Sequence, residues 1–314
     1  MRKAILLLIP LALFAQSKVG TAGMLFLELS PSARASGMAQ AFVAIADDAS
    51  ALYFNPAGIA WQHHRQFLGN VLAYHPEIDI YIHHVACVFP VSELIGAVGL
   101  SFTFLDAGWM KLTVPGIENE GGVDSLYTHW TGDYFTARAG ALQVSYAKKL
   151  TEKFSVGISL KGIYSAVYEY STWGVAGDIG TFYDTGIRSL KIGMMISNFG
   201  PDMCYITETF PLPMLFKVGI SYVPYETKTQ RLIVDIEGEH PNHNYERLAI
   251  GAEWSFNNVF FLRGGFRLAQ DPSLYAERYS FGLGVRGGPV GIDVSYTDWS
   301  SLGMLMRGQI TLNF

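Results

Sequence analysis

The residues most able to do chemistry in this chain are adjacent acids and closely spaced histidines. Asp47-Asp48 supplies two carboxylates, far short of the six to eight oxygens that calcium needs, so helix capping is the favoured role. His63-His64 and His83-His84 are neighbours, and neighbours on a strand face opposite ways. His240-Pro-Asn-His243 would bind zinc only weakly, because no further ligands are evident. The sequence therefore predicts neither a metal site nor a cofactor.

Nucleophilic catalysis is not indicated either. Serine, histidine and aspartate all occur, but no spacing singles out a nucleophile and its base. Cys87 falls in a strand-like segment and Cys204 in a long connection, so we favour free thiols over a disulfide, which an oxidising compartment would permit. The net charge of −5, without a basic block, disfavours a nucleic-acid partner. We expect a protein that is not an enzyme.

Charged residues recur on single faces of the strand-like segments. Charges turned inward are tolerated only if water or partners satisfy them. Acids on one wall and arginines on its neighbours predict either a salt-bridge lattice that braces a plug, which we favour, or a hydrated pore lining. The predicted lumen charges are Asp235, Glu237, Glu239, Arg263, Arg267, Arg278, Arg286 and Arg307.

The elements that must position these charges are strands with one apolar face. The last nine residues alternate, so that Ile310, Leu312 and Phe314 share the apolar face and Arg307 lies on the polar one. A final strand of this kind, ending on an aromatic residue, resembles the assembly signal of bacterial outer-membrane barrels. An edge strand of a soluble sheet is the alternative.

Turn signals divide the chain after residue 65 into about 14 segments of the length that tilted membrane strands need. We expect strands at 66–75, 78–89, 94–106, 134–149, 153–169, 174–184, 189–199, 213–223, 228–239, 245–256, 259–269, 276–286, 290–299 and 303–314.

The connections sort by length. Every second one is a tight turn, including 150–153, 256–259 and 287–289, whereas 107–133, 200–213 and 270–275 fall on the other side. Outer-membrane barrels have this arrangement, with short periplasmic turns and longer extracellular loops. The pattern predicts a closed, antiparallel, all-β transmembrane barrel. Five aromatic residues would form either an outer-facing cargo surface or a girdle at the lipid interface: Trp109, Tyr127, Trp130, Tyr134 and Trp173.

The amino-terminal segment predicts export. Arg2 and Lys3 precede an apolar run from Ala4 to Phe14, too short to span a bilayer as a helix, and small residues follow it. We interpret residues 1–17 as a signal peptide. Residues 18–65 then form a turn-rich segment inside the barrel mouth, here called the hatch, and residues 66–314 form the barrel.

Local signals within the hatch indicate short elements. Asp47 is a plausible N-cap for a helix from Asp48 to Phe54. Asn55 precedes Pro56 and is therefore pushed out of the helical region. The run from Asn55 to Gly58 suits a type I turn.

Several of these stretches resemble the PorV/PorQ family, a branch of the FadL-type outer-membrane transporters. They are Ala-Arg-Ala-Ser-Gly-Met at 33–38, Ala-Phe-Val-Ala-Ile-Ala-Asp-Asp-Ala at 41–49 and Asn-Pro-Ala-Gly at 55–58, with 262–266, 281–285, 291–296 and the terminal strand. Within them Arg34, Gly37, Asp47, Asp48, Asn55, Pro56 and Gly58 are the expected structural positions of the hatch. One departure is Ala39-Gln40, where glycine is typical.

The resemblance implies a 14-stranded outer-membrane barrel with an amino-terminal hatch. It also implies a role in type IX protein secretion, in which PorV-like members receive secreted cargo, so the expected partners are cargo carboxy-terminal domains, machinery proteins and lipid. The alternative is a FadL-like channel, in which relatives pass a hydrophobic ligand sideways through a wall opening. We expect residues 107–133 to contact the partner.

Overall fold

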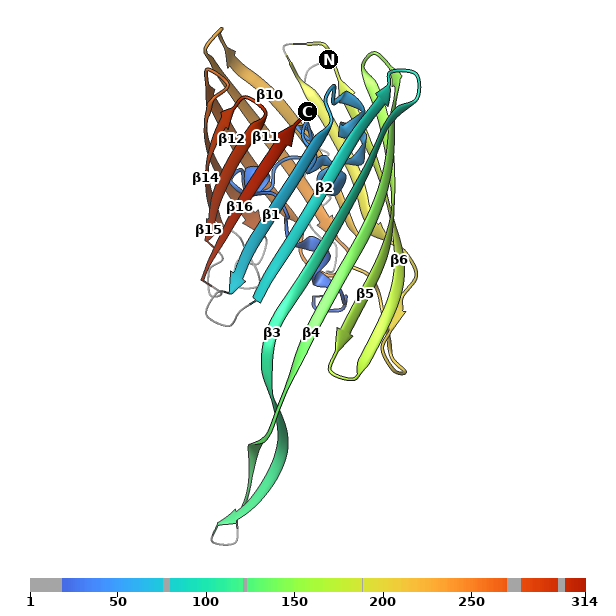
Figure 1. The fold of residues 1–314 in the computed structure, drawn as a ribbon, viewed down its shortest axis with the longest axis vertical. Helices are drawn as coiled ribbons and strands as arrows, with labels where there is room; N and C mark the ends of the chain where they lie inside the picture. The colour runs from blue at the N-terminus through green and yellow to red at the C-terminus, as the bar shows by residue number, and fades with distance from the viewer. Residues whose placement is uncertain (1–18, 76–79, 121–122, 188, 270–277, 299–302) are drawn as a thin grey trace, which may run out of the picture.

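Fourteen strands close into one antiparallel barrel in a computed structural model that describes residues 19–75, 80–120, 123–187, 189–269, 278–298 and 303–314 (Figure 1). Each strand pairs with its neighbours along the chain, and β1 and β16 meet to complete the ring. The predicted fold class and strand number are therefore confirmed. The predicted signal peptide at residues 1–17, the first two residues of the strand expected at 78–89 and the connection 270–275 lie outside the described residues.

The wall strands are β1 Gln66–His75, β2 Ile80–Ser92, β3 Gly96–Glu120, β4 Val123–Thr151, β5 Phe154–Val167, β6 Tyr170–Asp184, β7 Lys191–Phe199, β10 Leu215–Glu226, β11 Gln230–Pro241, β12 Arg247–Phe256, β13 Phe260–Ala269, β14 Tyr279–Gly287, β15 Val290–Asp298 and β16 Met304–Asn313.

The burial pattern of these strands is inverted relative to a water-soluble protein. On β13, Leu262 is 53% exposed on the outside, whereas Arg263 is 1% exposed on the inside. Large apolar side chains face outward on every wall strand, as the strand period of two requires. Such an exterior is stable only against lipid, and the closed ring leaves no unpaired strand edge there. Among the described residues, none of the helices has the length and hydrophobicity to cross a bilayer.

The terminal strand closes the barrel. β16 pairs with β1 from Asn313 opposite Gln66 to Met306 opposite Ala73, and the Phe314 N–H donates to the Arg65 carbonyl at 3.0 Å. Ile310 and Phe314 are 51% and 67% exposed on the outer face, and Leu312 is half-buried beside them. The expected alternation of this strand is therefore present.

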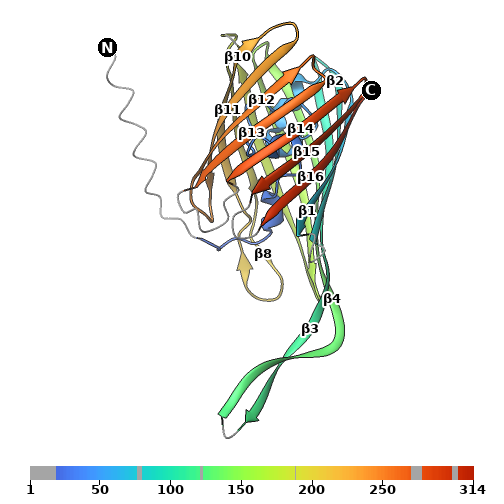
Figure 2. The same ribbon diagram turned by 90° about the vertical axis from the view of Figure 1, so that its left-hand side faces the viewer.

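Within the segment 107–133, expected to be a loop, the described residues 107–120 and 123–133 are instead strand. β3 and β4 continue beyond the wall as a two-stranded ribbon, here residues 107–136 (Figures 1 and 2). Gly108 and Gly132 adopt left-handed backbone where the β3–β4 register shifts, which bends and twists the ribbon. We call the barrel end that carries it the ribbon end and the opposite end the turn end.

Connection length follows the expected sides only in part, because two residues join β5 to β6 at the ribbon end and six join β6 to β7 at the turn end. Other links at the turn end are short, with two or three residues between β2 and β3, β4 and β5, β12 and β13, and β14 and β15. The ribbon end carries the ribbon and the segment 200–214. That segment contains a small separate sheet, β8 Met203–Cys204 paired with β9 Thr209–Phe210.

The hatch contains four short helices: η3 Leu25–Glu28, α1 Ala33–Ser36, α2 Ala51–Phe54 and η4 Pro56–Trp61. The predicted helix from Asp48 is wrong at its start, because α2 begins only at Ala51. The predicted Asp47 cap is also wrong. Asp48 is the residue whose carboxylate accepts the Ser50 N–H, at 2.9 Å, while Asp47 pairs with Arg34. Asn55 is extended, with φ −167° and ψ 100°, as its position before proline requires.

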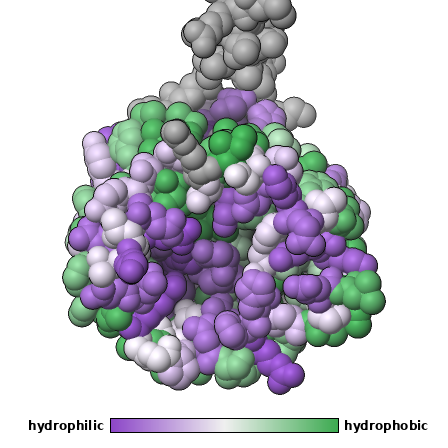
Figure 3. Space-filling view, turned by 90° about the horizontal axis from the view of Figure 1, so that it is seen from above, coloured by the Kyte–Doolittle hydropathy of each residue, from purple (hydrophilic) through white to green (hydrophobic). Residues whose placement is uncertain are grey.

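The hatch crosses the whole lumen rather than only its mouth. Near the ribbon end, the Gly20 N–H donates to the His243 carbonyl and the Gly23 N–H to the Pro211 carbonyl. Near the turn end, η4 packs beside β3, β4, β5 and β6. Figure 3 shows the turn end, where hydrophilic side chains surround a central hollow and hydrophobic ones gather at the perimeter.

Candidate functional site

Arg34 is the centre of the contact between hatch and wall. It lies on α1, whose N-cap Ser32 accepts the Ala35 N–H, and its side chain is almost fully buried. The guanidinium forms a two-pronged contact with Glu253 of β12 at 2.8 and 2.9 Å. It also donates to Asp48 at 2.9 Å and to Asp47. One arginine therefore ties two parts of the hatch to the barrel.

Wall residues extend this network. Arg263 of β13 donates to Glu253 at 2.6 Å and to Asp293 of β15 at 2.7 Å. Every charged group named in this network therefore lies within 3 Å of an oppositely charged partner. A buried arginine or carboxylate without its partner would be strongly destabilising.

A second network holds the middle of the hatch. Glu237 of β11 accepts the backbone N–H groups of Phe42 and Val43, each at 2.8 Å. Lys217 of β10 bridges Glu237 at 3.0 Å and Glu239 at 2.8 Å. Glu239 also receives Arg267 at 3.0 Å. The acids on one strand and the bases on its neighbours thus form a lattice around the hatch.

Lys217 was not among the sequence-predicted residues, although it lies on the inward face of a predicted strand. Lys161 is a similar omission, since it pairs with Asp178 at 2.9 Å inside the wall. Gln309 is a third, because its side-chain oxygen accepts the Ser32 hydroxyl and the Ala33 N–H. Their inward position on alternating strands was the available signal.

The other four predicted lumen charges take four different positions. Arg307 is buried and donates to the Ser30 carbonyl at 3.2 Å and to Thr297 at 3.0 Å. Arg286 lies over the ring of Phe261, 4.4 Å from its centroid, near the turn end. Arg278 precedes β14 and joins its neighbours through backbone bonds. Asp235 is fully buried, and neither carboxylate oxygen has a hydrogen-bond partner among the described residues.

Asn55 fixes the last turn of the hatch. Its side-chain amide donates to the carbonyls of Val43 and Thr181, at 2.9 and 3.0 Å, and its oxygen accepts the Ala57 N–H. The Gly58 N–H donates to the Asn55 carbonyl at 2.9 Å, as the expected turn requires. A side chain at Gly58 would collide with the Ala46 backbone. Pro56 opens η4 at its first position, where its missing N–H costs nothing.

Glycines on the inner wall allow the hatch to approach closely. A Cβ at Gly193 would collide with the Val43 carbonyl, and one at Gly251 would lie against Met38. Gly37 of the hatch faces Gly282 of β14 in the same way, because a Cβ on Gly37 would lie only 2.9 Å from the Gly282 Cα. The inward glycines therefore mark the path of the hatch across the strands.

The departure at Ala39-Gln40 has a backbone explanation. Both residues are buried and left-handed, with φ of 54° and 65°. Glycine adopts this conformation without the steric cost that a Cβ brings. The segment therefore keeps the backbone that glycine would favour.

An apolar cluster fills the lumen near the ribbon end. Phe26 and Leu27 of the hatch meet Met203 and Leu212 of the segment 200–214. The wall contributes small and aliphatic residues to the same cluster, including Ile163. Together with the ion-pair lattice, this cluster leaves the lumen packed along the described hatch.

The histidines and cysteines do not gather into one site. His240 contacts Glu246 at 3.2 Å, whereas His243 lies 3.6 Å from Glu28. Burial holds the pKa of His243 below its ordinary value, although the Glu28 carboxylate acts to raise it. Cys87 and Cys204 are both free thiols. Among the described residues, no three metal-ligating side chains meet.

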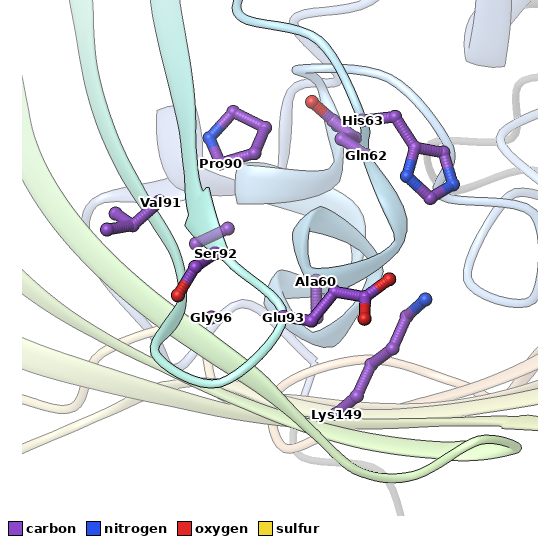
Figure 4. A pocket seen from close by; sticks show the side chains of 10 residues that line it. Ala60, Gln62, His63, Pro90, Val91, Ser92, Glu93, Gly96 and Lys149 are labelled. Carbon is purple, nitrogen blue, oxygen red and sulfur yellow. The ribbon is translucent and has the colours of Figure 1, made fainter.

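The turn end has a cleft of about 230 Å³ between the last residues of the hatch and the β2–β3 turn (Figure 4). Gln62 and His63 lie on one side, and Glu93 and Lys149 on the other. The Lys149 ammonium lies 4.2 Å from the centroid of the Trp61 ring. This cleft is open to solvent and has no counterpart of comparable volume among the described cavities within the lumen, which are about 10 Å³.

The ribbon presents the predicted aromatic residues. Trp109 is 72% exposed, and Trp130 packs edge-on against Tyr134, with 5.7 Å between ring centroids. Lys111 lies over the Trp130 ring at 5.2 Å. Tyr127 is exposed farther along β4, and Trp173 lies on β6, where it contacts Tyr164. The ribbon and the wall thus divide these residues between them.

A closed barrel with a lipid-compatible exterior and a buried amino-terminal plug defines the class as a hatch-bearing outer-membrane barrel. The profile of the family described as "Type IX secretion system protein PorV" matches residues 13–209, more than half of the chain. The chain belongs to this family.

Solved structures share the fold at low sequence identity. The Ralstonia pickettii toluene transporter TbuX aligns with a TM-score of 0.57 and 16% identity, covering 89% of this chain and 96% of its own. A Pseudomonas aeruginosa FadL homologue aligns with a TM-score of 0.56 and 12% identity, covering 96% of this chain and 100% of its own. The Pseudomonas putida toluene transporter TodX aligns with a TM-score of 0.53 and 12% identity, covering 83% of this chain and 91% of its own. No curated protein matches the sequence. These likenesses show the fold, and the FadL-type architecture is therefore confirmed.

Proposed function

We propose that this barrel is a non-enzymatic component of type IX protein secretion that binds cargo or machinery proteins at the outer membrane. The observation that carries the proposal is the ribbon. It projects well beyond the wall (Figure 1) and exposes Trp109, Trp130 and Tyr134, residue types that dominate protein-binding hot spots. Family membership supports the secretion role.

The contents of the lumen favour binding over conduction. The hatch is held by the ion pairs of Arg34 and by two backbone hydrogen bonds to Glu237, and residues 30–46 are buried throughout. Opening a path would require separating Arg34 and Glu237 from their partners, which is costly in a desolvated interior. A surface element that stands in water needs no such rearrangement.

Excision of the ribbon tests the proposal. Asp106 and Arg138 are directly paired, so residues 107–137 can be replaced by Asn-Gly, which forms a two-residue hairpin turn. We expect the tagged variant to lose co-purifying type IX components while it retains heat-modifiable mobility on gels, the mark of a folded barrel. Undiminished recovery of those components would overturn the proposal.

Two tryptophans supply a matched control within the folded chain. Trp130 is 44% exposed on the ribbon, and Trp254 is 37% exposed on the lipid face of β12. We expect Trp130→Ala to weaken recovery of partners by about tenfold, as hot-spot truncations do, and Trp254→Ala to leave it unchanged. Equal effects would indicate general damage to the barrel.

A hydrophobic-ligand channel is the second candidate function. The apolar cluster of Phe26, Leu27, Met203 and Leu212 favours it, because this cluster lies inside the wall against β4, β5 and β6. Uptake of toluene or long-chain fatty acid by cells carrying Asn55→Ala or Gly58→Ala tests this function. A change in uptake relative to the parent chain supports it, and unchanged uptake argues against it.

We also propose the division of the chain into an export signal at residues 1–17, a hatch at 18–65 and a barrel at 66–314. The run of apolar residues after Arg2 and Lys3 supports the signal. Amino-terminal sequencing of the protein purified from outer membranes should give a start between Gln16 and Lys18. Recovery of the intact Met1 terminus would contradict this division.

A further inference from the structure

The ribbon has two free strand edges. β3 pairs with β2 only as far as Asp106, and β4 pairs with β5 only from Ala137. Between these positions the two strands pair with each other and with no other described strand. An unpaired edge presents a row of backbone N–H and C=O groups, which is a template for a further strand. Such groups are not tolerated in lipid, so the ribbon stands in water.

The two edges differ in their capacity to accept a strand. β3 contains Pro115 and register shifts after Asp106 and after Lys111. Proline has no N–H and is confined to positions where its nitrogen faces the free edge, so it blunts that edge. β4 has no proline in the ribbon, and its pairing is regular from Val123 to Trp130. These eight residues match the usual length of a paired strand.

The faces of the ribbon also lack a covering layer. Every residue from Tyr127 to Tyr134 is exposed. A two-stranded sheet with both faces in water is marginally stable, and a third strand would add hydrogen bonds and cover part of a face. Trp130 and Tyr134 would then flank the added strand with rigid aromatic surface.

We propose that the free edge of β4, residues 123–130, binds an extended strand of another type IX secretion component by antiparallel strand addition. This inference rests on the proposed function and names how the ribbon engages its partner. A second copy of the chain is a poorer occupant. Two copies in one membrane extend their ribbons in the same direction, so antiparallel pairing of their β4 strands would require opposed membranes.

The pairing of Pro115 with Thr128 supplies a selective variant. In an antiparallel pair, two directly opposite residues either both direct their N–H and C=O groups toward each other's strand or both direct them toward the outer edges. Because the Pro115 nitrogen faces the free edge of β3, the Thr128 N–H faces the free edge of β4. Thr128→Pro should therefore block strand addition without removing a β3–β4 hydrogen bond. Thr128→Val changes the side chain, keeps the N–H and serves as the control.

The experiment compares tagged parent, Thr128→Pro, Thr128→Val and ribbon-excised chains purified in mild detergent from cells that contain the type IX machinery. Mass spectrometry quantifies the type IX components that each chain retains. We expect a loss of at least about tenfold for Thr128→Pro, comparable to the excised chain, and less than about twofold for Thr128→Val. Ile117→Cys with Leu126→Cys, an opposed pair, reports by disulfide formation whether the ribbon stays paired.

The outcomes separate the two proposals. If excision removes the components but Thr128→Pro with an intact cross-ribbon disulfide does not, strand addition is overturned and the binding role of the ribbon stands. If excision removes nothing, both fail. Recovery of only a second copy of this chain overturns the choice of partner. Should the disulfide fail to form, amide exchange of the parent decides: slower exchange at Thr128 in the complex supports the proposal, and equal exchange overturns it.

Discussion

At the scale of single residues, the inward charges carry the fold of the hatch. Glu253 receives Arg34 and Arg263, so each arginine neutralises a group that would otherwise be costly to bury. The lattice was predictable in outline, because alternation places acids and arginines on inner faces of adjacent strands. Its actual pairs were not, because the hatch contributes Arg34, Asp47 and Asp48 from a segment whose path no local pattern specifies.

Asp235 is the exception among these charges, and it yields a prediction of stability. Its buried carboxylate has no hydrogen-bond partner among the described residues, so its desolvation is not offset. We expect Asp235→Asn to stabilise the folded barrel by roughly 1–3 kcal/mol, whereas Glu253→Gln should destabilise it. The temperature at which gel mobility changes to that of the unfolded chain measures both. A lower transition temperature for Asp235→Asn would contradict this account of the site.

At the scale of elements, the strands were predictable and the ribbon was not. The wall strands alternate because one face meets lipid and the other meets the hatch, and this difference is visible in sequence. The ribbon has water on both faces, so its residues show no such contrast. Gly108, Gly116 and Pro115 within the ribbon are residue types typical of turns. In the structure, however, Gly108 marks a bend at a register shift, and Pro115 blunts the free edge of β3.

The hatch helices were too short for periodicity to define. α2 has four residues and depends on packing of Leu52 and Phe54 inside the barrel. No side chain caps its start at Ser50, and Arg34 instead binds both Asp47 and Asp48. The role of these adjacent acids depends on where Arg34 lies, and its contact with Glu253 on the distant strand β12 decides that position.

The fit between hatch and wall can be tested at Gly193. A side chain there collides with the Val43 carbonyl, whereas Gly162 on β5 has open space around its Cβ direction. We expect Gly193→Ala to displace the hatch and expose residues 30–59 to added protease, at a cost of about 1–3 kcal/mol for overpacking. Gly162→Ala should leave the hatch as protected as in the parent. Equal protection in both variants would show that the hatch does not depend on this close approach.

At the scale of the whole molecule, two different surfaces are built from one alternating sequence. The outer face presents apolar side chains to lipid, and the inner face presents polar and charged side chains to a plug. This plug runs from the His243 region at the ribbon end to Trp61 near the turn end. Sequence alone predicted the barrel and the presence of a hatch. The sequence predicted a hatch only at the barrel mouth, because no local pattern in residues 18–65 indicates how far the segment extends along the lumen.

We propose that this barrel is sealed by its hatch and acts through binding at its ribbon end. The most direct test is the ion conductance of the purified chain after insertion into a planar lipid bilayer. We predict no stable open level for the parent chain, because the ion pairs of Arg34 and the backbone hydrogen bonds that Glu237 accepts hold the plug in the lumen. A steady conductance from the unmodified chain would contradict the claim.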